Sequence, residues 1–202
     1  MDMFDPAELL NKRYQSDRQH NLEEAVRIYS RVVEADRTNW PAYVNRACAL
    51  NELGRFGEAL SDIEMVLVAI EAGRWAPESK DSLLRTLYGN RGFARLNQGD
   101  IAAAISNLQH ALEYEPDYAP EHAHLGTAFR KQGDLASARK HYDRAIELFR
   151  DKPKEKRATC EYGAAIRAEH GLRALGVHSM SSCTMIALRD KIVCQEWIDS
   201  LE

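Results

Sequence analysis

Residues 96–112 read LNQGDIAAAISNLQHAL, and variants of this phrase recur at residues 50–67 (LNELGRFGEALSDIEMVL) and 131–146 (KQGDLASARKHYDRAI). An alanine occupies the same register in four copies, at intervals of 34, 45 and 34 residues: Ala25, Ala59, Ala104 and Ala138. The chain is therefore built from a unit of 34 residues, and one interval carries 11 additional residues.

Small residues have fixed places in this unit. They recur at positions 8, 20 and 27, where they allow two antiparallel helices to approach closely. Position 15 is glycine in three copies, which predicts a left-handed turn at the end of a first helix: Gly54, Gly99 and Gly133. Asp100 and Asp134 follow two of these glycines and are expected to cap the second helix. A single pair cannot bury its own apolar face, so the pairs are expected to stack.

The 34-residue unit with these small residues resembles the tetratricopeptide repeat family. The resemblance implies an all-α, right-handed superhelical solenoid of antiparallel helix pairs. Four units fit within residues 1–152, namely 6–39, 40–73, 85–118 and 119–152, with an insertion at 74–84. The first unit departs from the pattern, with Arg13 in place of a small residue and Val32 in place of alanine.

The remaining segments are expected to space and cap the stack. Pro77 in the insertion predicts a break, followed by a helix that starts near Ser79. Residues 153–202 are predicted to form capping helices continuous with the solenoid, with a helix up to about residue 175 and a last helix over Ser181–Leu201. Such helices would cover the open apolar end of the last repeat.

Composition narrows the class of protein. The 202 residues include 27 Lys and Arg against 31 Asp and Glu, a formal net charge of -4, which disfavours nucleic acid and anionic membranes as partners. The N-terminus lacks a basic region followed by an apolar run, and the longest apolar stretch is only Met65–Ile70. We therefore expect a soluble, cytoplasmic protein. The four cysteines form no CxxC pair and are interpreted as reduced thiols.

Residues 91–95 read RGFAR and look like part of an RNA-binding octapeptide. Arg95, however, stands where that motif needs its second aromatic residue, and Gly92 falls at position 8 of the repeat. A phosphate loop would need a preceding apolar strand and a Lys-Ser or Lys-Thr pair, and the sequence has neither. RNA binding by helical repeats is kept only as a second alternative.

The sequence shows no recognisable catalytic or metal-binding pattern. Of seven histidines only His122 and His124 are close together, and at a spacing of two on a helix they are expected to face different directions. No combination of serine, histidine and acid, no glycine cradle and no pair of carboxylates stands out. The sequence therefore predicts a binding module without cofactor or metal, and not an enzyme.

In the family, the concave groove is formed by first-helix positions 2, 5, 6, 9, 12 and 13. Transferred to this chain, the resemblance implies a peptide-binding groove formed by ten residues: Asn11, Tyr14, Asn45, Cys48, Asn90, Phe93, Asn97, His124, Arg130 and Lys131. An asparagine amide both donates and accepts hydrogen bonds, so asparagines at position 6 suit an extended peptide backbone. The alternatives are that these asparagines only follow the family's commonest choice and that Phe93 packs between first helices.

Two observations concern the partner. The family's carboxylate clamp, which binds the acidic tails of chaperones, matches only one position in five in either possible register, so such tails are not predicted as partners. Arg130 and Lys131, followed by Lys154, Lys156 and Arg157, suggest a basic end that prefers an acidic segment; the alternative is a solvated charged face. The predicted function is an adaptor or co-chaperone-like scaffold that binds a protein segment. A self-assembling scaffold, which makes homo-oligomers through repeat ends or capping helices, is the first alternative.

Overall fold

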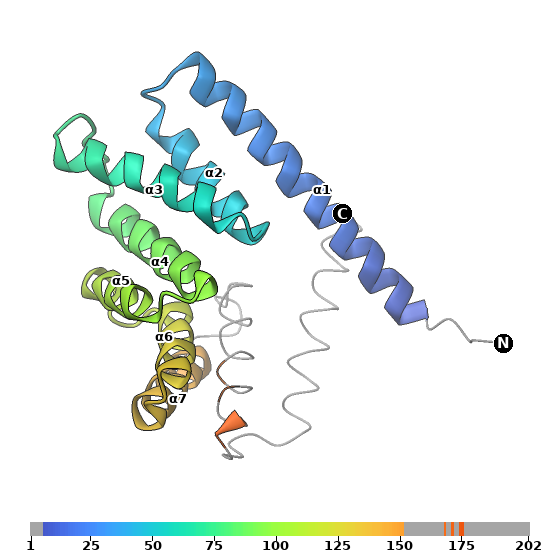
Figure 1. Cartoon of the computed structure of the whole chain (residues 1–202), viewed down its shortest axis with the longest axis vertical. Coiled ribbons are helices and arrows are strands. Elements are labelled where there is room, and N and C mark those ends of the chain that lie inside the picture. The colour runs from blue at the N-terminus through green and yellow to red at the C-terminus, as the bar shows by residue number, and fades with distance from the viewer. Residues whose placement is uncertain (1–5, 152–167, 169–170, 172–173, 176–202) are drawn as a thin grey trace. The chain divides into compact units, whose positions relative to one another are not determined.

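The computed structural model describes residues 6–151 together with residues 168, 171, 174 and 175, and for residues 6–19 it describes the backbone alone. This part of the chain contains seven helices and no strand, so the predicted all-α class is confirmed (Figure 1). The contacts divide the chain into residues 1–83 and 84–202, called here the N-terminal and the C-terminal unit. No helix within the described ranges is long and apolar enough to cross a bilayer.

The N-terminal unit contains helices α1 (Pro6–Ala35), α2 (Trp40–Glu52) and α3 (Phe56–Glu71), with α2 packed against both others. The side chain of Asn39 caps α2 by accepting a hydrogen bond from the Ala42 amide at 3.2 Å. Arg46 of α2 donates two hydrogen bonds to Asp62 of α3, at 2.7 and 2.6 Å, and one to Ser30 of α1 at 3.1 Å. One half-buried guanidinium therefore joins all three helices.

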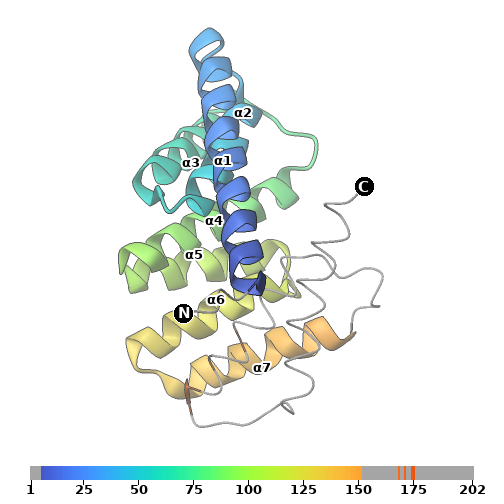
Figure 2. The same cartoon turned by 90° about the vertical axis from the view of Figure 1, so that its right-hand side faces the viewer.

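Helix α1 differs from the repeat pattern. The first unit, residues 6–39, was expected to form a helix, a turn and a second helix, but residues 6–35 form one continuous helix. That expectation was wrong because position 15 of this unit is His20, whereas the other three units have glycines with φ of 74°, 86° and 94° there. Without a glycine the left-handed turn is costly, and the helix continues. Figures 1 and 2 show the first half of α1 extending past α2 and α3.

Helix α4 (Lys80–Gln98) explains part of the insertion. The amide of Leu83 donates to the carbonyl of Ser79, so the helix begins beside Ser79, where Pro77 had indicated a start. Residues 80–84 of the insertion form the first turn and a half of α4, which is why this helix has 19 residues whereas α2 has 13. The insertion thus lengthens an existing helix.

The C-terminal unit continues with α5 (Ile101–Tyr114), α6 (Ala119–Gln132) and α7 (Leu135–Asp151). Both expected caps are present: Asp100 accepts from the Ala103 amide at 3.2 Å, and Asp134 accepts from the Ser137 amide at 3.0 Å. Each capping residue follows a glycine in the left-handed conformation, as the sequence predicts. The turns between first and second helices are therefore fixed locally.

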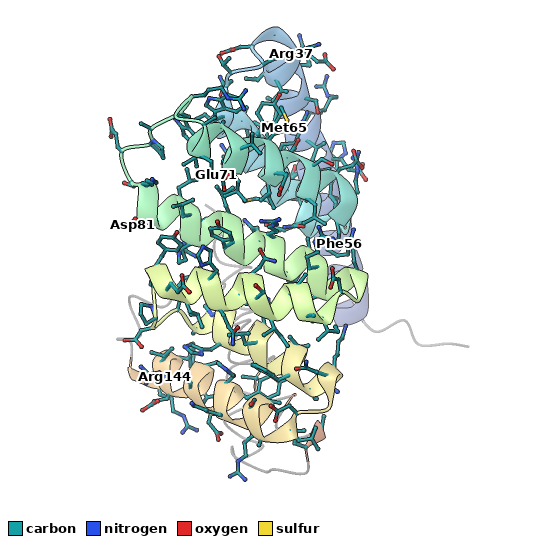
Figure 3. The ribbon with its side chains drawn as sticks, turned by 60° about the vertical axis from the view of Figure 1, so that its left-hand side comes forward. Arg37, Phe56, Met65, Glu71, Asp81 and Arg144 are labelled. Atoms are coloured by element: carbon teal, nitrogen blue, oxygen red, sulfur yellow. The ribbon has the colours of Figure 1, made fainter. Side chains whose placement is uncertain are left out.

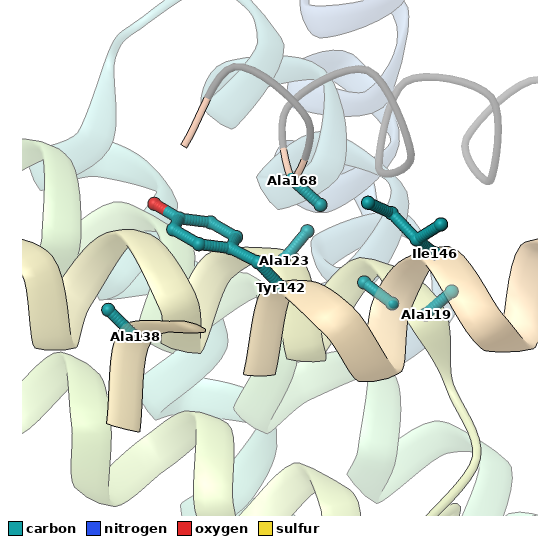
Figure 4. Close-up of a cluster of buried hydrophobic side chains, with 7 residues drawn as sticks. Ala119, Ala123, Ala138, Tyr142, Ile146 and Ala168 are labelled. Carbon is teal, nitrogen blue, oxygen red and sulfur yellow. The ribbon is translucent and has the colours of Figure 1, made fainter. Parts of the chain in front are cut away.

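The core of the C-terminal unit follows the small residues of the repeat. Gly92 lies against Leu108, and Gly126 lies against Tyr142, where a methyl group on either glycine would overlap its neighbour. Tyr142 packs among the alanines of α6 and α7 (Figure 4). Its ring also contacts Gly171, so it lies between two glycines. Close contact at these positions allows the paired helices to approach each other.

Little of the predicted cap falls within the described residues. Positions 168, 171 and 174 are helical; Ala168 is fully buried against α7, and Leu175 packs on the same cluster. These positions fall within the segment where the sequence predicts a helix, and the full extent of that helix stays a prediction. The other residues of 152–202, including the last helix expected at Ser181–Leu201, lie outside the described part of the chain.

Candidate functional site

Six predicted groove residues lie on α4 and α6, the two first helices of the C-terminal unit, and are called here the first-helix surface: Asn90, Phe93, Asn97, His124, Arg130 and Lys131. The rings of Phe93 and His124 are in contact, with centroids 5.0 Å apart and planes inclined at 43°. Both side chains are half-buried. The structure therefore brings residues 31 positions apart together and leaves part of each ring accessible.

One polar contact joins the C-terminal ends of the two helices, and another lies within α4. Lys131 Nζ of α6 donates to the Leu96 carbonyl of α4 at 3.4 Å, and Asn97 Nδ2 donates to the Phe93 carbonyl at 2.8 Å. Leu96 lies in the last turn of α4, where the terminal carbonyls lack i+4 donors within the helix, whereas Asn97 bonds one turn back along its own helix. Asn97 and Lys131 thus have structural partners, while both remain exposed, as does Arg130.

The other four predicted residues belong to the N-terminal unit. Asn45 is exposed and Cys48 half-buried on α2. Asn11 and Tyr14 lie within α1, in the segment for which only the backbone is described. Lys154, Lys156 and Arg157, the other members of the expected basic end, lie outside the described residues.

A buried carboxyl group beside the first-helix surface was not predicted from the sequence. Glu121, near the start of α6, is only 4% exposed, and its Oε1 fills the space that a side chain at Gly89 would need. Burial raises the pKa of Glu121 to about 8, although the Arg85 guanidinium, with its Nη1 3.6 Å from Oε1, opposes the shift. A protonated carboxyl group therefore predominates here at neutral pH.

Arg85 holds this region together. Its guanidinium lies 4.1 Å from the ring centroid of Tyr118, and its Nε lies 3.0 Å from the Glu115 carboxylate. The same side chain thus faces one half-exposed and one buried acid. A glycine at a first-helix position followed 32 residues later by a glutamate was the only available sequence signal, and it resembles an ordinary helix start.

His122 and His124 face different directions, as predicted. His124 contacts Phe93 of α4, whereas His122 contacts His141 of α7 with 3.0 Å between the two Nδ1 atoms. His122 Nε2 lies 2.9 Å from the Pro116 carbonyl and is assigned as its donor, so His122 Nδ1 accepts from His141. Burial lowers the pKa of both imidazoles, that of His141 to about 4.

The histidine pair lines an open hollow of about 840 Å³ on α6 and α7, away from Phe93. Arg144 lies at this hollow and is bonded to Asp117 and Glu147, so its charge is already compensated (Figure 3). A smaller hollow of about 480 Å³ lies beside Tyr88 and His110 on α4 and α5. In the part of the chain with described side chains, no group of three or more His, Cys, Asp or Glu residues could hold a metal ion.

Residues 82–151, which include nearly all of α4 to α7, match a family model described as tetratricopeptide repeat. This segment is similar to the tetratricopeptide repeat family. The helix pairs α4–α5 and α6–α7 fall within the matched segment, and small residues at the repeat positions pack within each pair.

Two relatives show the extent of the likeness. The chain is 26% identical over 162 residues to "Small glutamine-rich tetratricopeptide repeat-containing protein 2" of Saccharomyces cerevisiae, covering 80% of this chain and 40% of that protein. It is 22% identical over 152 residues to "Stress-induced-phosphoprotein 1" of Caenorhabditis elegans, covering 64% and 48%. The chain spans less than half the length of either relative.

Solved structures support the fold. MamA matches over 100% of both chains, with a TM-score of 0.53 and 19% identity. MamA 41-end from Desulfovibrio magneticus RS-1 covers 67% of this chain and 70% of its own, with a TM-score of 0.56 and 20% identity. A tetratricopeptide repeat protein from Parabacteroides merdae covers 90% and 68%, with a TM-score of 0.53 and 18% identity. At these identities the likeness concerns the helical-repeat fold alone.

Proposed function

We propose that the chain is an adaptor or co-chaperone-like scaffold whose first-helix surface binds an extended segment of a partner protein. The contact between Phe93 and His124 carries this proposal. It places two flat, half-buried rings side by side on adjacent first helices. Rings held in this way lose little conformational entropy when an apolar side chain of a partner packs on them.

Polar groups around the rings support an extended backbone as ligand. Asn90 lies one turn before Phe93 on α4, and its amide can donate to and accept from a main chain. Glu121, near the start of α6, is buried, and because its pKa is raised to about 8 it places no full negative charge close to the surface at neutral pH. The surface close to Phe93 therefore favours neutral contacts and an apolar anchor.

The exposed cations Arg130 and Lys131 favour one orientation of the bound segment. Both stand in the last turn of α6, beyond His124. Lys131 uses one donor on the Leu96 carbonyl and has two further N–H groups for a ligand. An acidic residue of the partner is thus expected toward the C-terminal end of α6, with an apolar residue at Phe93.

The chain provides matched controls for a binding test. Phe93→Ala and His124→Ala alter the first-helix surface, whereas Tyr88→Ala and His122→Ala alter residues on the same helices that line the outer hollows. A partner recovered with the full chain from its native cell would supply a labelled segment for fluorescence anisotropy. We expect a loss of about tenfold or more in affinity for each of the first two variants and little change for the controls.

The expected preference for an acidic residue in the partner is tested by measuring how the affinity depends on salt concentration. Arg130→Glu with Lys131→Glu should weaken binding at low ionic strength and flatten the salt dependence of the affinity. Equal effects of the surface and control variants would contradict the use of this surface. Unchanged low-salt affinity of the charge-reversed variant would contradict the acidic segment alone.

A further inference from the structure

Helix α1 of the N-terminal unit leaves partly exposed several residues whose equivalents in the other three repeat units are buried. Unit positions 20, 24 and 27 lie on the second helix of each repeat, and their side chains are 0–1% exposed in three units. These residues are Ala59, Ile63 and Val66 in the second unit; Ala104, Leu108 and Ala111 in the third; and Ala138, Tyr142 and Ala145 in the fourth. In α1 the same positions are Ala25, Tyr29 and Val32, which all remain partly exposed. Ile28 beside them is 49% exposed. This set of four residues is called here the open face of α1.

The straight course of α1 accounts for the open face. In the other units a glycine at position 15 turns the chain, so that the first helix returns along the second. In α1 the helix continues through His20, so residues 6–19 extend along the axis of residues 22–35. A segment on the same straight helix cannot fold back to cover the open face.

We propose that residues 6–19 of a second copy of this chain cover the open face, in a reciprocal exchange that makes a two-fold dimer. Those residues occupy first-helix positions 1–14 of the unit. They are therefore the segment that the repeat pattern assigns to this face. Because their own copy holds them out of reach, another copy supplies them.

The symmetry of α1 agrees with this exchange. Its 30 residues divide into 6–20 and 21–35, so the midpoint lies between His20 and Asn21. Two α1 helices lying antiparallel about a two-fold axis at that point would place each N-terminal half along the other copy's open face. Segments 6–19 and 22–35 both have 14 residues and are about 21 Å long as helices.

The residue types at the paired positions of the first unit also suit a contact between two copies. Position 23 contacts position 4 or 7 of its own first helix in two other units, through His141 with His122 and Asp62 with Arg46. In the first unit positions 4 and 23 are Leu9 and Ile28, so a polar pair is replaced by an apolar one. An apolar contact between the two copies is therefore expected where other units have a polar contact within the chain. This dimer uses α1 and is independent of the proposed peptide-binding surface.

The test measures association of the full-length chain by sedimentation velocity from about 1 to 100 μM. We expect wild-type dimer and a dissociation constant at least tenfold weaker for Leu9→Glu and for Ile28→Lys. A mixture of the two variants should restore dimer, because one interface then pairs Glu with Lys and the other pairs Leu with Ile. Met65→Lys, at a residue of α3 that is also 49% exposed, is the matched control and should leave the dimer unchanged.

A second variant tests the straight helix itself. His20→Gly with Asn21→Asp introduces the Gly-Asp pair found at residues 99–100 and 133–134. It should allow residues 6–19 to fold onto their own open face and give a monomer, with helicity by circular dichroism showing that the variant folds. A wild-type monomer at all concentrations would overturn the proposal. So would a dimer that survives the turn variant, responds equally to Met65→Lys, or is not restored by mixing.

Discussion

Gly92 of α4 lies directly against Leu108 of α5, so that a methyl group at Gly92 would stand only 2.6 Å from Leu108 Cγ and 3.2 Å from its backbone nitrogen. The Leu108 side chain is fully buried, so it has little room to move aside. The separation of the two helices is thus set by the absence of a side chain at one position.

Gly92→Ala is expected to lower the free energy of unfolding by about 1–3 kcal/mol, because overpacking outweighs the roughly 1 kcal/mol that alanine contributes to helix propensity. Urea denaturation of the purified variant measures this change. Ala102→Gly, at an exposed position of α5, reports the propensity alone and should cost about 1 kcal/mol. A more stable Gly92→Ala protein would show that the helices can separate without cost.

Gly99→Ala and Gly133→Ala test the turns. Neither glycine has an atom within 4 Å of an added methyl group, so the left-handed φ of 86° or 94° is the only source of strain. We expect each substitution to cost about 1 kcal/mol of stability, and Gly99→Asn to cost less because asparagine tolerates this conformation. Thermal melts of the three variants compare them, and equal melting temperatures for wild type and both alanine variants would contradict the prediction.

Glu121 should make stability fall as the pH rises. The folded protein keeps a proton on this carboxyl group up to about pH 8, whereas the unfolded chain releases it near its ordinary value of 4.5. The free energy of unfolding should therefore decrease between these two pH values, by at most about 1.4 kcal/mol per pH unit from this group. Urea denaturation at a series of pH values should show the decrease in wild type and its absence in Glu121→Gln. The exposed Glu34→Gln should keep the wild-type slope.

The histidine pair should act in the opposite direction. Burial lowers the pKa of His141 to about 4 from its ordinary value of 6.5, so the unfolded chain binds more protons between these values. Stability should therefore rise with pH across this window, aided by His122, whose pKa is also lowered by burial. His141→Gln should flatten the rise relative to wild type in the same denaturation series. If the half-buried His110→Gln has an equal effect, the pair is not the origin of the pH dependence.

The sequence predicted features that depend on a few neighbouring residues. Gly99 and Asp100 specify a turn and a cap within two positions, and the structure has both. The alanines at position 20 of the second, third and fourth units, and at position 27 of the third and fourth, are buried as the repeat requires. The opposite orientations of His122 and His124 follow from helix geometry alone. The use of Asn45, Asn90 and the other groove residues in binding stays a prediction.

Features that depend on long-range neighbours were missed. From the sequence alone, Glu121 would be expected to be an exposed, charged residue near a helix start. Its burial depends on a contact with Gly89, which lies 32 residues away in the sequence. The continuous α1 was missed for another reason: the 34-residue spacing was extended into residues 6–39, although His20 lacks the backbone freedom that the turn needs. The repeat spacing predicts where the equivalent residues of each unit fall. The residue at position 15 then decides whether the chain turns there and forms two antiparallel helices.

Tyr142 between Gly126 and Gly171 has a consequence for how the chain unfolds. The Tyr142 ring contacts Gly126 of α6 on one side and Gly171, which follows α7, on the other. If either contact is lost, an almost completely buried aromatic side chain becomes exposed. In helical-repeat proteins the coupling between neighbouring elements determines whether they melt together or one by one. A single tyrosine thus provides nearest-neighbour cooperativity, and the last repeat and the segment after it are expected to melt as one unit.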